Sequence, residues 1–211
     1  MTVIRQIRVG SMAVFCYIVG DESSKTCALI DPAAETDRIL RETENLGFQV
    51  TKVINTHGHS DHISGNAQII AATKAELLIH ELEARRLGKI TTKAFSRLLG
   101  GKGSPPPDRL LKDNDIIQIG QVSLKVIHTP GHTMGGISLY TKGHVFTGDT
   151  LFVGAVGRTD LGGGSYLLLL QSIKEKLYTL PPDTIVWPGH DYGVTPSSTI
   201  AREKEKNPDT L

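Results

Sequence analysis

The segment that decides the fold reads Thr56-His57-Gly58-His59-Ser60-Asp61-His62, directly after an apolar run typical of a buried strand. Residues at positions i and i+2 of an extended segment point the same way, so His57 and His59 can reach one metal ion. Asp61 and His62 lie where the chain turns and can face a second ion beside the first. Four such groups packed together without a cation would leave donors unpaired, so the segment predicts a metal site.

Three further candidate ligands each follow a predicted strand or a tight turn. They are His132 in His128-Thr129-Pro130-Gly131-His132-Thr133, Asp149 in Thr147-Gly148-Asp149-Thr150, and His190 in Trp187-Pro188-Gly189-His190-Asp191-Tyr192. Loops at strand ends carry functional residues because a rigid sheet positions them. Five histidines and two aspartates are about the complement that two divalent ions need, and these ligands accept zinc, iron or manganese. The remaining histidines lack a companion motif and are interpreted as hydrogen-bonded surface residues: His80, His128 and His144.

The composition is that of an ordinary folded chain. Of its 211 residues, 39% are hydrophobic and 21% charged, which excludes a disordered protein. The net charge of +1 and the lack of a basic stripe give no reason to expect a nucleic-acid partner. We interpret residues 1–211 as a single domain; the sequence leaves open whether it forms homo-oligomers.

The sequence predicts a cytoplasmic protein without membrane contact. Residues 1–8 alternate apolar and polar side chains, which is strand patterning and not a secretory signal. No apolar run is long enough to span a bilayer. Two cysteines are too few for a disulfide framework, and Cys16 and Cys27 both lie in apolar strand-like runs. We therefore expect both to be buried free thiols.

Strand and helix patterns alternate in two blocks, which predicts two sheets with helices outside them. Strands are predicted over residues 3–9, 13–19, 26–30, 50–55, 76–79, 116–119, 122–127, 136–140, 144–147 and 184–187. Helices are predicted over residues 35–46, 63–72, 81–87, 165–178 and 197–206. Residues 88–115 are the least regular segment. Within it, the glycines and prolines of residues 100–107 predict a surface loop, either a substrate lid or a plain connection.

Five motifs together resemble the metallo-β-lactamase superfamily, and within it the glyoxalase II-like hydrolases and the related persulfide dioxygenases. They are Thr-His-Gly-His-Ser-Asp-His, His-Thr-Pro-Gly-His-Thr, Phe-Thr-Gly-Asp-Thr-Leu-Phe, Gly-Arg-Thr-Asp and Pro-Gly-His-Asp-Tyr. The match extends over nearly the whole chain. The resemblance implies an α/β fold, a four-layer αβ/βα sandwich of two mixed β-sheets with helices on the outer faces.

The resemblance also implies roles for individual residues. His57, His59 and His132 resemble the ligands of one metal ion, Asp61, His62 and His190 those of the other, and Asp149 the carboxylate that bridges them. Asp61 further resembles a catalytic residue that orients the nucleophile. Arg158 and Tyr192 fall where glyoxalase II enzymes place residues that bind glutathione, although a surface arginine and a packing tyrosine would look the same.

Two reactions fit this ligand set. In a glyoxalase II-type hydrolase, two divalent ions, most often zinc, hold a hydroxide that attacks a thioester such as a hydroxyacylglutathione. In a glutathione persulfide dioxygenase, one Fe(II) is bound by two histidines and a carboxylate, here His57, His132 and Asp149. The dioxygenases often retain the ligands of the second ion without filling that site, so the ligand set alone fits both reactions. We favour the hydrolase because the full set of seven ligands and the long loop before Asp115 resemble the short glyoxalase II group. Other members of the family and a metal-binding protein without catalysis stay open as further alternatives.

Two departures from the family pattern bear on the substrate. Class B β-lactamases commonly carry a cysteine where Asp149 stands and are exported, so the sequence argues against antibiotic hydrolysis. Longer glyoxalase II enzymes append a helical domain that helps to bind glutathione, whereas this chain stops at Leu211. We therefore expect a thioester substrate whose carrier thiol is held differently or is not glutathione.

Overall fold

The first sheet is formed by the amino-terminal strands, whose β-branched and apolar side chains favour extended backbone. The computed structural model describes residues 1–87 and 89–211, apart from the side chains at positions 90, 91 and 93. The strand order follows the sequence: β1 (Thr2–Val9), β2 (Val14–Asp21), β3 (Thr26–Ile30), β4 (Gln49–Ile54), β5 (Glu76–His80) and β6 (Arg109–Leu111). Strands β1 to β3 pair antiparallel, and β3 to β6 pair parallel.

The second sheet comes from the carboxy-terminal half of the chain. Its order is β14 (Ser198–Thr199), β13 (Ile185–Pro188), β10 (His144–Gly148), β9 (Ile137–Thr141), β8 (Val122–His128) and β7 (Ile116–Ile119). Only β10 and β13 pair parallel, and the other neighbours are antiparallel. A short hairpin of β11 (Leu151–Phe152) and β12 (Ala155–Val156) follows β10.

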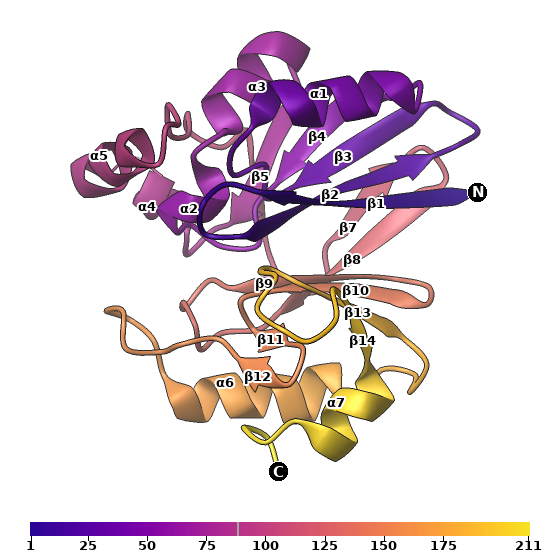
Figure 1. Cartoon of the computed structure of the whole chain (residues 1–211), viewed down its shortest axis with the longest axis vertical. Coiled ribbons are helices and arrows are strands. Elements are labelled where there is room, and N and C mark those ends of the chain that lie inside the picture. Colours follow the sequence, from indigo (N-terminus) through magenta and orange to yellow (C-terminus); the bar gives the residue numbers. More distant parts are fainter. Residues whose placement is uncertain (88) are drawn as a thin grey trace.

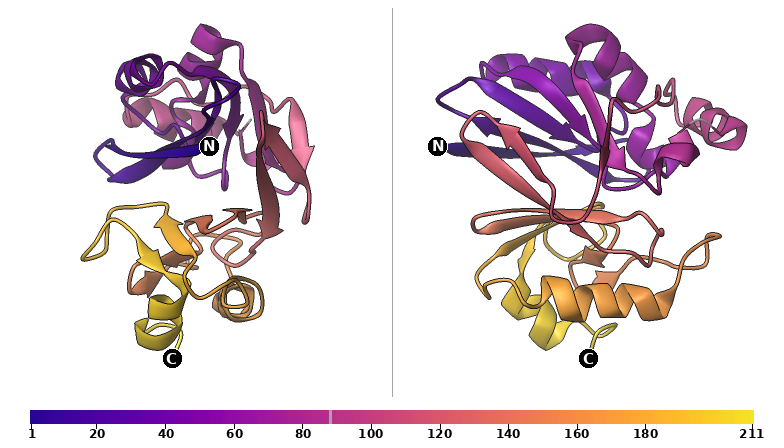
Figure 2. Two further views of the ribbon diagram at one scale, coloured as in Figure 1. Left: turned by 90° about the vertical axis from the view of Figure 1, so that its right-hand side faces the viewer. Right: turned by 180° about the vertical axis from the view of Figure 1, so that it is seen from behind.

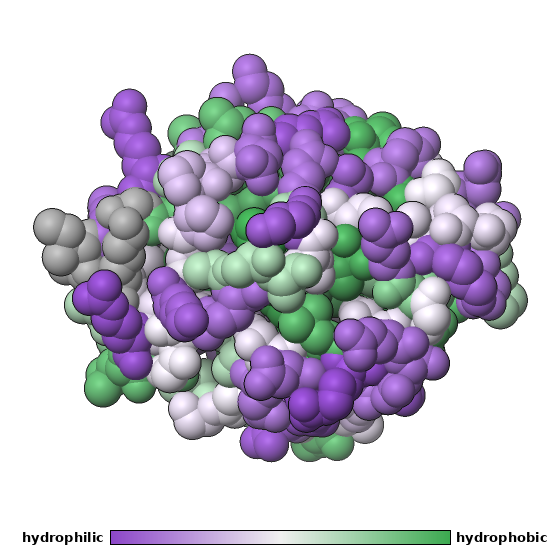
Figure 3. Space-filling view, turned by 90° about the horizontal axis from the view of Figure 1, so that it is seen from above, coloured by the Kyte–Doolittle hydropathy of each residue, from purple (hydrophilic) through white to green (hydrophobic). Residues whose placement is uncertain are grey.

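Helices cover the outer face of each sheet, while the two sheets face each other (Figure 1). On the first sheet lie α1 (Thr36–Asn45) and α3 (Asn66–Thr73), and Figure 3 shows hydrophilic side chains over much of their side of the molecule. On the second lie α7 (Ile200–Lys206) and α6 (Tyr166–Ser172), which continues into the π-helical turn η1 (Ile173–Leu177). The short helices α2 (Ser60–Ile63), α4 (Ala84–Leu87) and α5 (Ile90–Leu98) gather at one end of the sandwich (Figure 2).

Three apolar layers hold these elements together. The central layer joins the inner faces of both sheets and includes Tyr17 and Ile54 from the first and Leu139 and Phe146 from the second. The two outer layers lie between each sheet and its helices. The predicted four-layer sandwich of two mixed sheets is therefore confirmed.

The predicted strands agree with the structure to within two residues at each end, but the segment after β5 differs. Residues 81–83 form a turn, so only the last turn of the predicted helix forms as α4. Residues 88–115 were expected to be irregular, yet they contain α5 and β6; Gly88 itself lies outside the described residues. Helix α5 escapes prediction because it begins with three β-branched residues of low helix propensity. Its formation depends on packing against α2 and α4.

The two cysteines, the glycine- and proline-rich loop and the length of the helices agree with the sequence. Cys16 and Cys27 are buried and free, as expected. Residues 101–107 contain no helix or strand, in agreement with the predicted loop. None of the helices that the structure describes is long and apolar enough to cross a membrane.

We expect Phe146→Ala to lower the free energy of unfolding by about 3–5 kcal/mol, because it opens a cavity between the sheets. The side chain is fully buried and packs edge-on against Tyr17. Urea denaturation measures the effect, with Ile116→Ala as the control at a side chain that is 46% exposed. Equal losses in the two variants would contradict the assignment of the core.

Candidate metal centre

The predicted ligands reach one place because each follows the carboxyl end of a strand. Strand β4 delivers residues 56–62, and His59 remains extended before α2 begins at Ser60. From the second sheet, β8 leads to His132, β10 to Asp149 and β13 to His190. The two sheets pack face to face, so loops that are far apart in sequence meet at one end of the sandwich.

His57, His59 and His132 form a first triad. The Nε2 atom of His57 lies 3.1 Å from Nδ1 of His59, and Nε2 of His132 lies 2.9 Å from the same atom. Ligand nitrogens about 2.1 Å from one ion in tetrahedral geometry lie about 3.4 Å apart. The three nitrogens therefore have the spacing that a single ion needs.

Asp61, His62 and His190 form a second triad beside the first. The Nε2 atoms of His62 and His190 are 3.1 Å apart, and Oδ2 of Asp61 lies 3.6 Å and 3.5 Å from them. These three groups can likewise hold one ion.

Asp149 lies between the two triads. Its Oδ2 atom is 3.5 Å from Nε2 of His132 and 3.3 Å from Nε2 of His190, and its Oδ1 atom is 3.4 Å from Nε2 of His62. Oδ1 is buried and has no hydrogen-bond partner among the described residues. A buried carboxylate oxygen without a partner is costly unless a cation satisfies it, so the donor set fits divalent metal ions.

Most of the histidines are oriented through their second ring nitrogen. His132 Nδ1 lies 2.6 Å from the Arg158 carbonyl oxygen, and His190 Nδ1 lies 2.8 Å from that of Met12. His62 Nδ1 lies 3.0 Å from Oδ2 of Asp31. Such contacts fix the ring and its tautomer, and they leave Nε2 directed at the centre.

Asp31 is a residue of the site that the sequence analysis missed. It is 1% exposed and accepts hydrogen bonds from the backbone N–H of Thr56 at 2.8 Å and from its hydroxyl at 2.6 Å, besides facing His62. In the sequence, Asp31-Pro32 gave only the signal of a strand end. Its hydrogen-bond partners lie about 25 to 31 residues away in the sequence, so the residues around Asp31 do not indicate these contacts.

The environment fixes the protonation of these groups. Burial and the neighbouring His62 hold the pKa of His57 well below its usual value, and burial with His132 lowers the pKa of His59 to about 4. Burial opposes the charged form of His62, but Asp149 and Asp61 outweigh it and raise its pKa to about 10. Burial likewise opposes ionisation of Asp149, whereas His62 and His190 hold its pKa well below the usual range. Neutral imidazoles at His57 and His59 and an ionised Asp149 suit a cation, whose binding would displace the proton of His62.

Arg158 and Tyr192 lie at the mouth of a 730 Å³ cavity that also contains His59, Asp61, His132, Asp149 and His190. Arg158 forms a two-pronged ion pair with Asp160, with both N–O distances 2.7 Å. Tyr192 stacks on His190 with ring centroids 4.5 Å apart. The structure therefore places both predicted substrate residues beside the triads, and their binding role stays a prediction.

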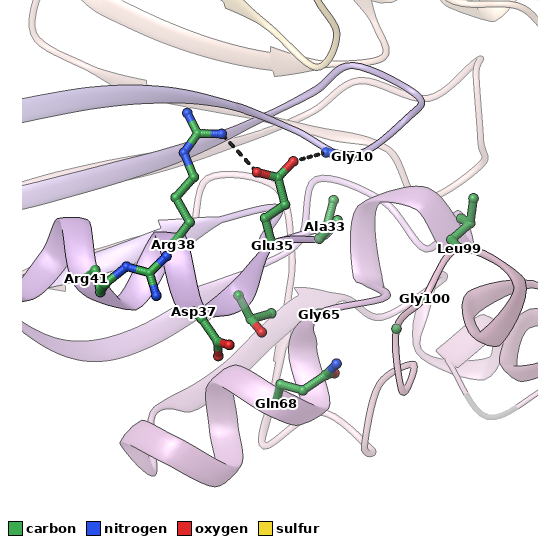
Figure 4. Close-up of a pocket in the computed structure, with 13 residues that line it drawn as sticks. Gly10, Ala33, Glu35, Asp37, Arg38, Arg41, Gly65, Gln68, Leu99 and Gly100 are labelled. Carbon is green, nitrogen blue, oxygen red and sulfur yellow. Dashed lines mark hydrogen bonds and ion pairs between the residues drawn. The ribbon is translucent and has the colours of Figure 1, made fainter.

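The histidines without a motif belong to neither triad, and the expected surface position is wrong for His80, which is buried at 4% exposure. His80 and His128 stack on each other with ring centroids 4.3 Å apart, and His144 accepts a hydrogen bond from the indole of Trp187. A second cavity, of 540 Å³, lies beside the start of α1 and contains none of the predicted site residues. There Glu35 accepts the Gly10 N–H and pairs with Arg38 (Figure 4).

Comparison with known proteins agrees with this geometry. The profile of the metallo-β-lactamase superfamily matches residues 9–190. The chain belongs to the metallo-β-lactamase superfamily. This match includes all seven predicted ligands, Asp31 and Arg158, whereas Tyr192 lies just beyond it.

Relatives of this chain are named for three different activities. The human mitochondrial persulfide dioxygenase ETHE1 is 33% identical over 208 residues, which are 97% of this chain and 74% of that protein. The hydroxyacylglutathione hydrolase GloC of Haemophilus influenzae is 32% identical over 207 residues, 92% of this chain and 91% of that protein. The crystal structure of the BLEG-1 B3 metallo-β-lactamase superposes with a TM-score of 0.89 at 31% identity, over 99% of this chain and 100% of that one.

We expect Asp31→Ala to weaken metal binding about 10- to 100-fold, because His62 and Thr56 lose the carboxylate that orients them. A competition titration with a chromophoric chelator measures the dissociation constants. Asp21→Ala is the matched control, since Asp21 is equally buried but accepts its hydrogen bonds from Ser23 and Gln121 in a distant turn. Unchanged metal affinity in Asp31→Ala would contradict the orienting role.

Proposed function

We propose that this protein is a metal-dependent thioester hydrolase of the glyoxalase II type that uses two divalent ions. The observation that carries the proposal is the position of Asp149, whose two oxygens face ligands of both triads. Beside it, the ligand atoms of the second triad lie 3.1–3.6 Å apart, a spacing that suits a second ion. The relationship to GloC supports the same interpretation.

The residues account for the main requirements of thioester hydrolysis. Ions held by the two triads would supply a water of lowered pKa and polarise a carbonyl oxygen. Asp61 is partly exposed, so its carboxylate can accept a hydrogen bond from an attacking water while also facing His190. Phe152 and Tyr192 shield the side of His190 from solvent, because both rings pack against it. A thiolate leaves readily, so the mechanism requires no general acid.

A persulfide dioxygenase is the second candidate, favoured by the 97% of this chain that aligns with ETHE1. It would require only a face of His57, His132 and Asp149 around one Fe(II). Under this alternative, the second triad contributes structure and no chemistry.

We expect Asp61→Ala and His62→Ala each to lower kcat/KM for thioester hydrolysis at least about 100-fold, because each removes a ligand of the second ion. Spectrophotometric assay of lactoylglutathione, together with metal analysis of the purified protein, provides the measurement. Oxygen uptake with glutathione persulfide and hydrolysis of a β-lactam are assayed in parallel.

Two metals per chain with thioester turnover would agree with the hydrolase. One iron per chain, with oxygen consumption that survives both substitutions, would establish the dioxygenase and overturn the proposal. Turnover of the β-lactam alone would overturn it as well.

A further inference from the structure

Exposed apolar side chains line the metal cavity, which bears on the carrier thiol that the sequence left open. Met12, Phe95, Leu161 and Tyr192 line the cavity and are 42–57% exposed. They come from the β1–β2 turn, from α5 and from two loops of the second half of the chain. Large apolar side chains exposed together at a cavity mouth mark a surface that a ligand covers.

The polar groups expected to recognise glutathione already hold contacts within the protein. Among the described residues, Arg158 is the only lysine or arginine that lines this cavity, and it pairs with the exposed carboxylate of Asp160. The hydroxyl of Tyr192 donates to the Met12 carbonyl oxygen at 3.2 Å. The two carboxylates of glutathione would therefore have to compete with Asp160 for a single guanidinium group.

We propose that the site takes thioesters with an apolar acyl group on an uncharged thiol, in preference to glutathione thioesters. The acyl group would pack against Phe95 and Leu161, and Phe152 and Tyr192 add two aromatic rings to the lining, with ring centroids 5.8 Å apart. This inference rests on the proposed hydrolase function.

The test compares four substrates: the lactoyl and phenylacetyl thioesters of glutathione and of N-acetylcysteamine. We expect kcat/KM to be at least about tenfold higher for phenylacetyl-N-acetylcysteamine than for lactoylglutathione. Burial of about 55 Å² of additional apolar surface by the preferred substrate would account for a tenfold ratio.

Leu161→Ser should remove most of the preference for the phenylacetyl group. Leu167→Ser, at an exposed leucine outside the cavity, is the matched control and should leave it intact. Asp160→Asn, which frees Arg158, should raise kcat/KM for the glutathione thioesters only.

Failure of this inference is distinguishable from failure of the hydrolase. Preferred turnover of lactoylglutathione would overturn the substrate class and leave the hydrolase in place. If none of the four thioesters is hydrolysed, calorimetric binding of S-phenethylglutathione and S-phenethyl-N-acetylcysteamine decides the inference. Tighter binding of the glutathione thioether would then overturn it, and tighter binding of the uncharged thioether would support it.

A second inference concerns Glu83, a buried carboxylate that connects the loops of the first triad. It is 1% exposed, its Oε2 accepts the Gly58 N–H at 3.0 Å, and its Oε1 accepts the Gly135 N–H at 3.0 Å. Gly58 stands between His57 and His59, and Gly135 lies three residues after His132. One side chain thus joins loops that come from different sheets.

Arg86 completes this connection. Its Nε atom lies 3.3 Å from Oε2 of Glu83, and it donates to the Gly162 carbonyl oxygen at 3.2 Å, in the loop after Arg158. The approach is close, because a Cβ atom at Gly58 would lie 2.9 Å from Glu83 Oε2 and one at Gly135 would lie 2.7 Å from its Cγ. Burying a carboxylate is costly unless it is paired and hydrogen-bonded, and here both backbone N–H partners belong to loops that carry ligands of the first triad.

We infer that Glu83 is a positioning residue that sets the spacing of His57 and His59 relative to His132. In Glu83→Gln the side-chain N–H₂ would face one of the two backbone N–H groups. Two donors cannot bond to each other, so one of the two hydrogen bonds would be lost. We therefore expect metal affinity at the first triad to fall about 10- to 100-fold, with no change at the second.

Competition titrations in two backgrounds assign the effect to a triad. In Asp61→Ala, which disables the second triad, Glu83→Gln should weaken zinc binding; in His132→Ala, which disables the first, it should not. Arg86→Gln leaves Glu83 in place and should weaken the same site by a smaller factor, so the inference stays testable if Glu83→Gln does not fold.

Glu203→Gln is the matched control, because Glu203 is also 1% exposed but accepts the N–H of Gly154, which belongs to the β11–β12 hairpin and not to a loop that carries a predicted ligand. If Glu83 contributed only to stability, Glu83→Gln and Glu203→Gln would lower the unfolding midpoint by the same amount, and both variants would bind zinc as tightly as the parent protein. That result would overturn the inference.

Discussion

The contact between the inner faces of the two sheets is the constraint on which the metal centre depends. Neither sheet carries a complete ligand set: the first supplies residues 57–62, and the second supplies His132, Asp149 and His190. The apolar layer between the sheets therefore determines whether seven polar groups meet. Its energy is non-directional, so it brings the loops together without fixing their mutual position.

Hydrogen bonds between the two halves supply that missing precision. The hydroxyl of Tyr17 donates to the Pro188 carbonyl oxygen at 2.6 Å. The backbone N–H of Phe15 donates to the carbonyl oxygen of Gly189, the residue before His190, at 2.8 Å. On the other side, the Ile137 N–H donates to the Thr56 carbonyl oxygen at 2.9 Å. All three bonds lie within a few residues of a metal-site loop, in apolar surroundings where an unmade bond would be costly.

The sequence predicted those features that local pattern encodes. Hydrophobic periodicity located ten of the fourteen strands in the described residues but missed the short β6, β11, β12 and β14, the last within a segment predicted as helix. The dense cluster at residues 57–62 indicated a metal site on its own. The residues that escaped prediction act over long range. Asp31 signalled only a strand end, and Glu83 fell within the helix predicted over residues 81–87 with no sign of a role at the site. The partners of both residues lie 25 to 52 residues away in the sequence. Helix α5 was missed because its propensity is weak and its stability comes from tertiary packing.

The origin of the ligands also links metal binding to folding. Each triad takes two side chains from the loop after β4 and one from the second sheet, while Asp149 faces both triads. An ion at either triad would therefore join the two halves of the sandwich, and its binding free energy would add to the apolar contact between them. Loss of that contact would separate the ligands, and without ions Asp149 Oδ1 would stay buried with no hydrogen-bond partner among the described residues. Packing and ligation thus stabilise the same arrangement, so a substitution between the sheets should weaken metal binding even where it contacts no ligand.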